Sequence, residues 1–375
     1  MLKAILIDCL PLEMDHQQAK FRLDEAESLI KTYGGVVLLK TYQKKIAPVY
    51  KTYIGSGKLE ELKEEGLKLG ANILIINNEL KPMQTYNLSE ELGKSNMQVW
   101  DRIDLILKIF QKHAKTKESQ LEIELASLRH MGPRIYGMGM ILSRQGGGIG
   151  GRGIGETNTE IMKRHISEHI RKIEKDLDKA RANRELHRAS RRRKNFSTVG
   201  IVGYTNAGKS SLLNALTNKG AYAANELFAT LDTRVAKLYL PDLHQQVLLT
   251  DTIGFIQDLP PNLIKSFQST LDETIEADLL LHVIDLSDER WEYKISVVNE
   301  VLGNLNATHK PIIYVFNKID LLASDFNFQE VAKKFARFHP CFTSTYQMKG
   351  FEELKENIQR NFKKVNKPLS DQNEE

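Results

Sequence analysis

The chain has 375 residues, of which 41% are hydrophobic and 27% charged, so its composition is that of a globular protein long enough for two or three domains. Its two cysteines, Cys9 and Cys341, are too few and too far apart for a disulfide framework or a zinc site. The first residues lack a signal-peptide pattern and no apolar stretch approaches the ~20 residues that cross a bilayer, so we expect a cytoplasmic protein without a membrane span.

Residues 1–100 alternate between short apolar runs and helical stretches. The apolar runs are LKAILID, GGVVLLKTY, ANILIINNE and MQVWDR, and the helical stretches cover residues 16–33, 57–69 and 82–93. Apolar runs separated by helices are typical of a parallel sheet with helical crossovers. The sequence therefore predicts a small N-terminal parallel α/β domain over residues 1–100.

Residues 101–196 show no strand pattern and two helical ones. Apolar residues recur at helical spacing, first at Leu121, Leu125 and Leu128 and then at Ile166, Ile170, Ile173 and Leu177. Each set lies on one face of a helix, so the segment predicts a helical hairpin as the middle domain.

A glycine-rich stretch, RQGGGIGGRGIGETNTE at residues 144–160, connects these two helices. Gly148, Gly150 and Gly153 have the spacing of a dinucleotide-binding loop, but that loop binds pyrophosphate where a strand ends and a helix begins. Helices are expected on both sides of this stretch, which argues against a nucleotide site. A flexible linker and a loop that contacts a partner through its backbone both remain open.

A basic segment covers residues 163–194, with thirteen lysines and arginines against five acidic residues. Its net charge of about +8 exceeds the +5 of the whole chain, so the remainder is slightly acidic. The segment indicates a polyanionic partner, and nucleic acid rather than membrane because no apolar face accompanies it. A solvated helix face is an equally open alternative.

Strands and helices alternate again over residues 197–365. The predicted strands are FSTVGIVG, VAKLYLP, QQVLLTD, LLLHVIDL, PIIYVFN and a last one near HPCFTS. This pattern predicts a doubly wound sheet, so the whole chain is expected to be an α/β multidomain protein. The polar tail at residues 366–375 is expected to be disordered.

The first of these strands runs into a phosphate-binding loop, since GYTNAGKS matches the G-x-x-x-x-G-K-[ST] pattern and the helix SSLLNAL follows. Glycines let successive N–H groups face the phosphates at the positive end of that helix. We expect Lys209 to reach the β and γ phosphates and the Ser210 hydroxyl to bind Mg²⁺. The predicted nucleotide-binding residues here are Gly203, Tyr204, Thr205, Asn206, Ala207, Gly208, Lys209, Ser210 and Ser211.

Two later segments match the metal and γ-phosphate elements of a P-loop, Ras-like G domain. The first comprises Asp251, Thr252, Ile253 and Gly254, where a carboxylate holds Mg²⁺ and the Gly254 N–H faces the γ phosphate. The second is FATLD, in which the Thr230 hydroxyl is placed to complete the metal shell. The predicted metal ligands are therefore Ser210, Thr230 and Asp251, and FATLD adds Phe228, Ala229, Leu231 and Asp232 to the predicted site.

The base is selected by the segment after PIIYVF, which comprises Asn317, Lys318, Ile319 and Asp320. A carboxylate accepts two hydrogen bonds from the N1–H and exocyclic amine of guanine, whereas adenine offers no such donor pair. Asp320 therefore predicts GTP rather than ATP. A further guanine-contacting loop is expected at Thr343, Ser344 and Thr345, although the last stands where alanine is usual.

The predicted catalytic residues are Lys209, Thr230, Gly254 and Asn206. Ras-like enzymes orient the attacking water with a glutamine directly after D-x-x-G, but this chain has Phe255 there. We therefore expect slow intrinsic hydrolysis that a partner accelerates. Asn206 resembles the asparagine of potassium-stimulated GTPases, so K⁺ is a candidate cofactor beside Mg²⁺, and a loop-bracing hydrogen bond is the alternative.

In combination, these segments resemble the HflX family, in the Obg-HflX branch of translational GTPases. The family-like segments are YIGSGKLEEL at 53–62, SRQGGGIGGRGIGETNTE at 143–160, GYTNAGKSSLLNAL at 203–216, FATLD at 228–232 and DTIGFI at 251–256. The resemblance implies a GTPase that binds the large (50S) ribosomal subunit and its rRNA and splits stalled or idle 70S ribosomes. We expect it to act as a monomer.

The resemblance also implies that the glycine-rich loop lies near the peptidyl transferase centre, where bare backbone, Arg144 and Arg152 follow rRNA by shape. Two departures limit this comparison. The family's RGPGETQLE reads RGIGETNTE here, and only residues 366–375 follow the G domain where many members have a small further domain. No role of that domain is carried over.

Other functions remain open. The chain fits an RNA-binding regulator or chaperone, or a ribosome biogenesis factor, in which GTP hydrolysis is secondary. An ATPase is disfavoured by Asn317 and Asp320, and YIGSGK is no second phosphate loop because Thr52 stands where its first glycine would be. A second nucleotide site in the N-terminal domain is left undecided.

Overall fold

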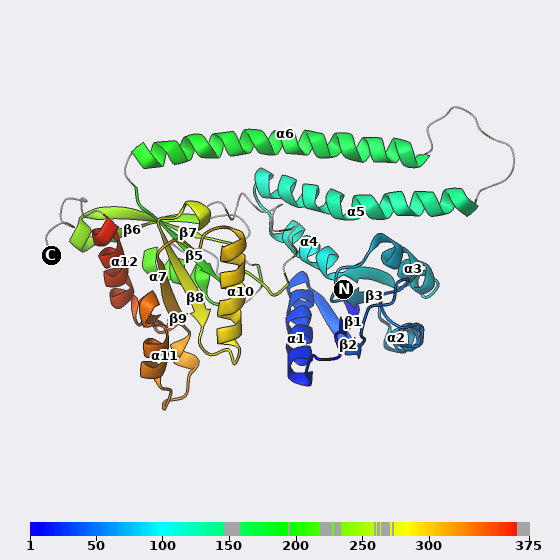
Figure 1. Ribbon diagram of the computed structural model, residues 1–375, viewed down its shortest axis with the longest axis horizontal. Helices are drawn as coiled ribbons and strands as arrows, with labels where there is room; N and C mark the ends of the chain where they lie inside the picture. The colour runs from blue at the N-terminus through cyan, green and yellow to red at the C-terminus, as the bar shows by residue number, and fades with distance from the viewer. Residues whose placement is uncertain are drawn as a thin grey trace. The chain divides into compact units, whose positions relative to one another are not determined.

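The computed structural model describes residues 1–145, 158–193, 196–217, 227–228, 234–258, 260, 263, 271 and 274–365. The chain divides into two compact units, Met1–Lys179 and Ala180–Glu375 (Figure 1). Among these described residues, no helix combines the length and the apolar character that a bilayer crossing needs. The mixed α/β architecture predicted from the sequence is confirmed, with a helical middle region between two sheets.

The first unit begins with a four-stranded parallel sheet in the order β2-β1-β3-β4. Its strands are β1 (Leu2–Leu10), β2 (Gly35–Lys44), β3 (Ile73–Ile76) and β4 (Gln98–Asp101), and its helices are α1 (His16–Tyr33), α2 (Ser56–Leu69), α3 (Pro82–Gly93) and α4 (Arg102–His113). Helices α2 and α3 share one apolar cluster with the sheet, and α1 and α4 pack together and against its strands. Because both faces are covered, β1 and β3 are buried almost throughout.

Local signals fix the limits of α1. The side chain of Asp15 accepts a hydrogen bond from the Gln18 N–H at 2.7 Å, which caps the first turn. At the other end Gly34 adopts φ +99° and donates to the carbonyls of Ile30 and Lys31. This left-handed glycine stops the helix and lets β2 begin at the next residue.

The middle region consists of α5 (Lys117–Gln145) and α6 (Asn158–Arg193). The two helices pack through Leu125, Ile173 and Leu177, which lie in the apolar seams predicted from the sequence. An ion pair between Arg129 and Glu174, at 2.7 Å, joins the same two helices. Within the predicted glycine-rich stretch at 144–160, residues 146–157, with Arg152, lie outside the described residues, as does the predicted tail at 366–375.

Helix α5 is tied to the N-terminal sheet by a cluster of four charged side chains, Asp101, Asp104, His130 and Arg134, here called the charged cluster. The Arg134 guanidinium contacts one oxygen of each carboxylate, at 2.5 Å and 2.7 Å. The His130 Nε2 lies 3.3 Å and 3.4 Å from the other two oxygens. Because the guanidinium occupies oxygens that a metal ion would need, the geometry is that of an ion-pair cluster.

Burial disfavours the charged form of His130, but its hydrogen bonds to Asp101 and Asp104 outweigh that effect and raise its pKa to about 9. The pKa of Asp104 shifts the other way, to about 2: burial opposes this shift, and contacts with His130 and Arg134 overcome it. His130 and Asp104 therefore both carry charge near neutral pH, and their charges are opposite.

The second unit contains a six-stranded sheet in the order β10-β9-β8-β5-β7-β6. Its strands are β5 (Thr198–Gly203), β6 (Arg234–Leu240), β7 (Gln245–Asp251), β8 (Leu279–Asp285), β9 (Ile312–Asn317) and β10 (Cys341–Phe342). All pairs are parallel except β6 with β7, which a 3₁₀ turn, η1 (Pro241–Leu243), connects. This is the doubly wound G-domain sheet predicted from the sequence, with one antiparallel strand at its edge.

Helices cover both faces of this sheet (Figure 1). Helices α7 (Lys209–Thr217) and α12 (Phe351–Val365) share an apolar cluster on one face, and α10 (Trp291–Asn304) and α11 (Phe328–Lys334) belong to clusters on the other. The short helices η2 (Ile319–Leu321) and η3 (Ala336–Phe338) follow β9 and α11. Since five strands are parallel, their carboxyl ends meet at one edge of the sheet, where ligands of such folds bind.

Candidate nucleotide-binding site

The phosphate loop lies at the carboxyl end of β5 and needs two of its glycines for close backbone approach. Gly203 adopts φ +152°, and a Cβ there would lie 2.3 Å from the carbonyl oxygen of Val283. Gly208 adopts φ +96°, and its Cβ would lie 2.2 Å from the Asn317 side-chain nitrogen. No larger residue fits at either position, so the loop is held tightly between β8 and the end of β9.

Lys209 begins α7 and is buried within the loop. Its Nζ donates to the Tyr204 carbonyl oxygen at 2.8 Å, which curls the side chain back over the loop. A Cβ at Gly254 would lie 2.8 Å from this Nζ, so only glycine leaves room for the ammonium group there. Burial lowers the pKa of Lys209 to about 8, although the nearby Asp251 carboxylate opposes the shift.

Two oxygen donors meet beside Lys209. The Ser210 hydroxyl donates to Asp251 Oδ2 at 2.6 Å, and Asp251 is fully buried at the end of β7. The Thr252 hydroxyl donates to the Ile201 carbonyl at 2.7 Å, which fixes the chain directly after Asp251. A hydroxyl and a carboxylate at the start of a helix are hard oxygen ligands, the type that Mg²⁺ prefers. The donor set therefore fits the magnesium ion predicted from the sequence.

The segment after Gly254 is paired with the phosphate loop as a short parallel bridge between Tyr204 and Phe255. The Thr205 N–H donates to the Phe255 carbonyl at 2.8 Å, and the Phe255 N–H donates to the Gly203 carbonyl at 3.1 Å. The Gln257 N–H donates to the Tyr204 hydroxyl at 2.8 Å. Phe255 itself is buried in the apolar core beside α10, so its ring packs there instead of offering a polar group to water.

The predicted base-reading residues gather at the carboxyl ends of β9 and β10. Asn317 donates from Nδ2 to the Ala207 carbonyl at 2.9 Å, and its Oδ1 accepts from the Thr345 N–H at 3.3 Å. The Ser344 hydroxyl donates to Asp320 Oδ1 at 2.5 Å. These contacts fix the amide and the carboxylate in place through the loop that contains Thr345.

The remaining base-loop residues brace this arrangement. Lys318 adopts φ +64° and its Nζ lies 2.6 Å from Asp285 Oδ2 at the end of β8. The Ile319 N–H donates to the Thr343 carbonyl at 3.3 Å, which joins η2 to the strand β10. The segment from Asn317 to Asp320 is therefore held from two sides.

Asn206 stands at the tip of the phosphate loop, exposed and at φ +61°. Its side chain makes no hydrogen bond to any residue that the structure describes. The loop-bracing hydrogen bond considered from the sequence is thus not seen within the described part of the chain.

One predicted segment is described only in part. Phe228 is buried at φ +58°, whereas Ala229, Thr230, Leu231 and Asp232 lie outside the described residues. The structure brings together the other predicted site residues, from Gly203 to Ser211, from Asp251 to Gly254, from Asn317 to Asp320, and from Thr343 to Thr345. Their roles toward a nucleotide stay predictions.

Sequence reasoning missed two residues that the structure places against the loop. Asp285 holds Lys318, and His282 of β8 lies behind the loop, buried and in edge-on contact with Tyr314. A signal for His282 exists in the sequence, because it is the one polar side chain inside the apolar run LLLHVI.

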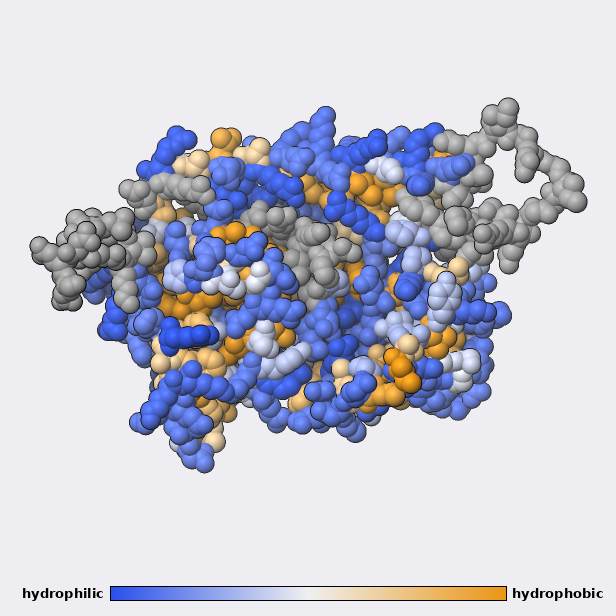
Figure 2. Space-filling view, in the orientation of Figure 1, coloured by the Kyte–Doolittle hydropathy of each residue, from blue (hydrophilic) through white to orange (hydrophobic). Residues whose placement is uncertain are grey.

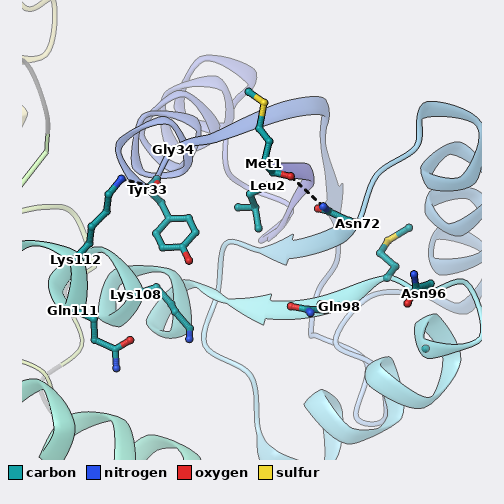
Figure 3. A pocket seen from close by; sticks show the side chains of 12 residues that line it. Met1, Leu2, Tyr33, Gly34, Asn72, Asn96, Gln98, Lys108, Gln111 and Lys112 are labelled. Carbon is teal, nitrogen blue, oxygen red and sulfur yellow. Dashed lines mark hydrogen bonds between the residues drawn. The ribbon is translucent and has the colours of Figure 1, made fainter.

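A separate cleft of about 940 Å³ opens at the amino ends of the N-terminal strands (Figure 3). Lysine, amide and tyrosine side chains line it, and none of its described lining residues carries a carboxylate. The Lys112 Nζ donates to the Tyr33 carbonyl at 3.2 Å, and the Lys108 Nζ lies 5.7 Å from the centre of the Trp100 ring. The polar lining residues are Tyr33, Asn72, Asn96, Gln98, Lys108, Gln111 and Lys112.

Three family models together match most of the chain. The model described as "GTP-binding GTPase N-terminal" matches residues 20–111, and that described as "GTP-binding GTPase Middle Region" matches residues 113–191. The model described as "50S ribosome-binding GTPase" matches residues 198–318, which contain the phosphate loop and the Asn317–Lys318 pair. The predicted combination of a G domain with an N-terminal domain and a helical region is confirmed.

Individual relatives are similar in sequence to most of this chain. The GTPase HflX of Caldanaerobacter subterraneus is 47% identical over 320 residues, covering 85% of this chain and 73% of the relative. That of Lacrimispora saccharolytica is 41% identical over 340 residues, covering 91% and 78%. A crystal structure of a GTP-binding protein from Sulfolobus solfataricus in complex with GDP shares the fold, with a TM-score of 0.51 at 24% identity over 97% of this chain and 100% of that one. The chain is therefore a P-loop GTP hydrolase and belongs to the HflX family of GTPases.

Proposed function

We propose that this GTPase binds the large (50S) ribosomal subunit and separates 70S ribosomes into subunits, with the bound nucleotide controlling its hold. The observation that carries the proposal is the match of residues 198–318 to the family described as "50S ribosome-binding GTPase", within a chain that matches HflX relatives over most of its length. The N-terminal domain at 1–100 and the helical hairpin at 101–196 form the ribosome-binding part, and the G domain at 197–365 forms the switch.

The phosphates of GTP bind at the start of α7 in this proposal. Lys209 contacts the β and γ phosphates, and Ser210 and Asp251, together with Thr230, hold Mg²⁺. The ion neutralises charge that develops on the phosphates during transfer. The short distance between Ser210 and Asp251 supports this role, since it places the two oxygens side by side.

Guanine binds beside Asn317 and Asp320. The Asp320 carboxylate accepts from the N1–H and the exocyclic amine, and the backbone of Ser344 and Thr345 borders the base. The hydrogen bond from Ser344 to Asp320 supports this assignment because it holds the carboxylate in one orientation.

The γ phosphate switches the segment that follows Gly254. In this proposal the Gly254 N–H faces the γ phosphate and Thr230 would be one of the residues that hold Mg²⁺, so both segments would be ordered with GTP and released after hydrolysis. The bridge between Tyr204 and Phe255 supports a direct link from the phosphate loop to this segment. Such a switch changes the ribosome affinity of the ribosome-binding part only if this part makes different contacts in the GTP-bound and GDP-bound states.

Hydrolysis is slow until a partner completes the site. Phe255 has no group that orients water, and the exposed side chain of Asn206 makes no hydrogen bond to a described residue. We include K⁺ as a candidate cofactor at Asn206, where a cation supplies positive charge that an arginine finger supplies elsewhere. Comparing hydrolysis in potassium and sodium buffers tests this role, and equal rates rule it out.

Ribosomal RNA is the polyanion that the ribosome-binding part meets. Most of the α6 surface in view is hydrophilic in Figure 2, and the basic segment at 163–194 lies largely on this helix. The cleft of the N-terminal domain adds two lysines and four side-chain amides (Figure 3). Lysines neutralise phosphates, and amides donate to phosphate and sugar oxygens, so both surfaces suit an RNA backbone.

The proposal is tested by sucrose-gradient profiles of 70S ribosomes mixed with the protein and GTP, a non-hydrolysable GTP analogue, or GDP. We expect subunits to appear with either triphosphate and 70S particles to persist with GDP. The matched variant Lys209→Ala, which loses its phosphate contact, leaves 70S particles intact. Splitting that is independent of nucleotide, or retained by Lys209→Ala, would refute the proposal.

The alternative is an RNA-binding regulator, chaperone or biogenesis factor in which GTP hydrolysis is secondary. The basic charge of 163–194 favours this alternative as much as ribosome splitting. The same gradients distinguish them, because an RNA-binding regulator cosediments with free RNA and leaves the 70S peak unchanged.

A further inference from the structure

A small cavity lies behind the phosphate loop, between the loop, β8 and α10. Its volume is about 10 Å³, the space for the centre of one water molecule. The lining includes Tyr204 and Thr205 from the loop, His282 from β8, and Trp291 and Lys294 from α10. The cavity is therefore on the side of the loop away from the start of α7.

Two residues of this lining each carry a buried polar side-chain atom that lacks a partner within the described part of the chain. The Thr205 Oγ1 and the His282 Nδ1 have no hydrogen-bond partner among the described residues. Thr205 is 5% exposed and His282 is 1% exposed, so bulk water reaches neither side chain. Buried polar groups in folded proteins are almost always satisfied, by protein or by ordered water. A cavity with space for one water molecule, lined by two residues that carry such atoms, is a typical water site.

His282 is suited to bind a neutral ligand. Burial lowers its pKa to about 3, with a further contribution from the positive charge of Lys209. The imidazole therefore stays neutral, with one nitrogen as donor and the other as acceptor. Its ring is held edge-on against Tyr314, with 4.9 Å between ring centres, which restricts its orientation.

Thr205 connects the cavity to the D-x-x-G segment. Its N–H donates to the Phe255 carbonyl, and its methyl group packs on Gly254, where a Cβ would lie only 2.7 Å away. A hydrogen bond at Oγ1 would fix the rotamer of Thr205 and with it the position of that methyl group. The chain of contacts thus runs from His282 through Thr205 to the glycine that faces the γ phosphate in the proposed site.

We propose that one water molecule in this cavity bridges Thr205 Oγ1 and His282 Nδ1, and that His282 is thereby a positioning residue for Gly254 during GTP hydrolysis. The inference rests on the proposed phosphate site. It goes beyond that site by giving the buried histidine of β8 a part in the γ-phosphate-dependent step.

The first test compares His282→Asn with His282→Gln. The amide of asparagine lies where Nδ1 of histidine lies, whereas that of glutamine reaches the place of Nε2. We expect His282→Asn to keep kcat close to the wild-type value and His282→Gln to lower it roughly fivefold, the effect of losing one ordinary hydrogen bond. Equal kcat values for the two variants would overturn the inference, because the identity of the nitrogen would then not matter.

GDP affinity separates this inference from the proposed phosphate site. Both variants should bind GDP within about twofold of wild type, because Gly254 contacts only the γ phosphate. If wild-type protein fails to bind GDP, the phosphate site is wrong. If it binds and hydrolyses normally but kcat is insensitive to His282, only the water bridge is wrong. Tyr314→Phe is the control, since it keeps the ring beside His282 and loses only a hydroxyl contact with Asn299.

A double-mutant cycle tests whether the two side chains act through one bridge. Thr205→Val removes the hydroxyl and keeps the backbone N–H and the methyl contact. We expect Thr205→Val combined with His282→Gln to lower kcat no further than the worse single variant. Multiplicative losses would show two independent effects and contradict the bridge.

The water bridge can also be tested directly in the wild-type protein. A high-resolution crystal structure of the full chain should contain a water within hydrogen-bond distance of Thr205 Oγ1 and His282 Nδ1. The kcat-against-pH profile should show no inflection from His282 near pH 6.5, since that side chain stays neutral. A dry cavity, or an inflection that His282→Asn abolishes, would overturn the inference.

Discussion

The Ser210 hydroxyl donates to Asp251 Oδ2 across 2.6 Å, although 41 residues separate the two in the chain. This contact joins the first residues of α7 to the end of β7, so two of the three predicted magnesium ligands lie side by side. A preformed oxygen pair needs little rearrangement, which favours metal binding at this point.

The Ser210→Ala variant should need more Mg²⁺. Loss of one hydroxyl ligand costs about 1–2 kcal/mol, so the Mg²⁺ concentration for half-maximal GTP hydrolysis should rise on the order of tenfold. Hydrolysis rates measured over a Mg²⁺ titration check this. Thr217→Ala on the same helix is the control, because among the described residues its hydroxyl bonds only to the Leu213 carbonyl. An unchanged Mg²⁺ requirement in Ser210→Ala would remove Ser210 from the metal site.

Nucleotide affinity should depend on pH above 8. The pKa of Lys209 is about 8 in the chain without nucleotide, and phosphates beside the ammonium group raise it. Binding therefore takes up a proton above pH 8, so affinity is constant below that pH and falls by up to about tenfold per pH unit above it. Calorimetric titration with GDP between pH 7 and about 9 measures the slope. Lys209→Arg stays charged throughout, so its weaker affinity should show no such slope.

The choice of base should depend on the carboxylate of Asp320. Asp320→Asn replaces a double acceptor by an amide, so GTP affinity should fall at least about 10³-fold. Xanthosine triphosphate, which has a carbonyl in place of the exocyclic amine, should bind this variant better than GTP does. Competition among GTP, xanthosine triphosphate and ATP checks both statements. Ser344→Ala should weaken GTP binding less, because it only loosens the carboxylate.

The charged cluster should make the stability of the first unit depend on pH. His130 has a folded pKa of about 9 against an ordinary 6.5, so its contribution is fully present below pH 6.5 and is lost as pH rises through 9. We expect about 1–3 kcal/mol less free energy of unfolding at pH 9.5 than at pH 6. Urea unfolding followed by Trp100 fluorescence in a Trp291→Phe background measures it. His130→Gln should remove most of this difference.

The cleft of the N-terminal domain should contribute to RNA affinity through charge. Lys108→Ala should weaken binding to the large subunit and reduce the slope of log affinity against log salt by about 1. Lys68→Ala is the matched control, an exposed lysine of α2 already paired with Glu65. Affinity and salt slope measured by filter binding decide the point, and identical slopes for Lys108→Ala and wild type would remove the cleft from the interface.

Sequence periodicity predicted the sheets but underestimated the length of one strand. The apolar run was expected to end near Asp8, yet β1 continues to Leu10. The carboxylate of Asp8 is buried because the Arg22 Nε lies 3.0 Å away and Asn77 donates to it at 2.7 Å. These partners are 14 and 69 residues distant, so no local pattern could reveal that a charge is tolerated inside the strand. The antiparallel direction of β6 was likewise beyond a pattern of alternation alone.

The parts of the candidate site that consist of short sequence motifs could be predicted. The parts that depend on contacts between residues distant in the chain could not. GYTNAGKS, DTIG and NKID each combine backbone geometry and chemistry in a few consecutive residues, so the sequence suffices to place them. Two other contacts depend on the packing of β5, β7 and β8. The Tyr204 hydroxyl accepts a hydrogen bond from the Gln257 N–H, and His282 lies behind the loop. Such packing is a property of the folded sheet.

The hydrogen bond from Asn317 to the Ala207 carbonyl has a practical consequence for engineering. It makes the wall around the base and the wall around the phosphates one continuous structure, with no space for a Cβ at Gly208 between them. A substitution at Asn317 would therefore damage triphosphate recognition along with base choice. An orthogonal version of this enzyme, driven by an unnatural nucleotide inside cells, is best built from Asp320, with Asn317 left untouched.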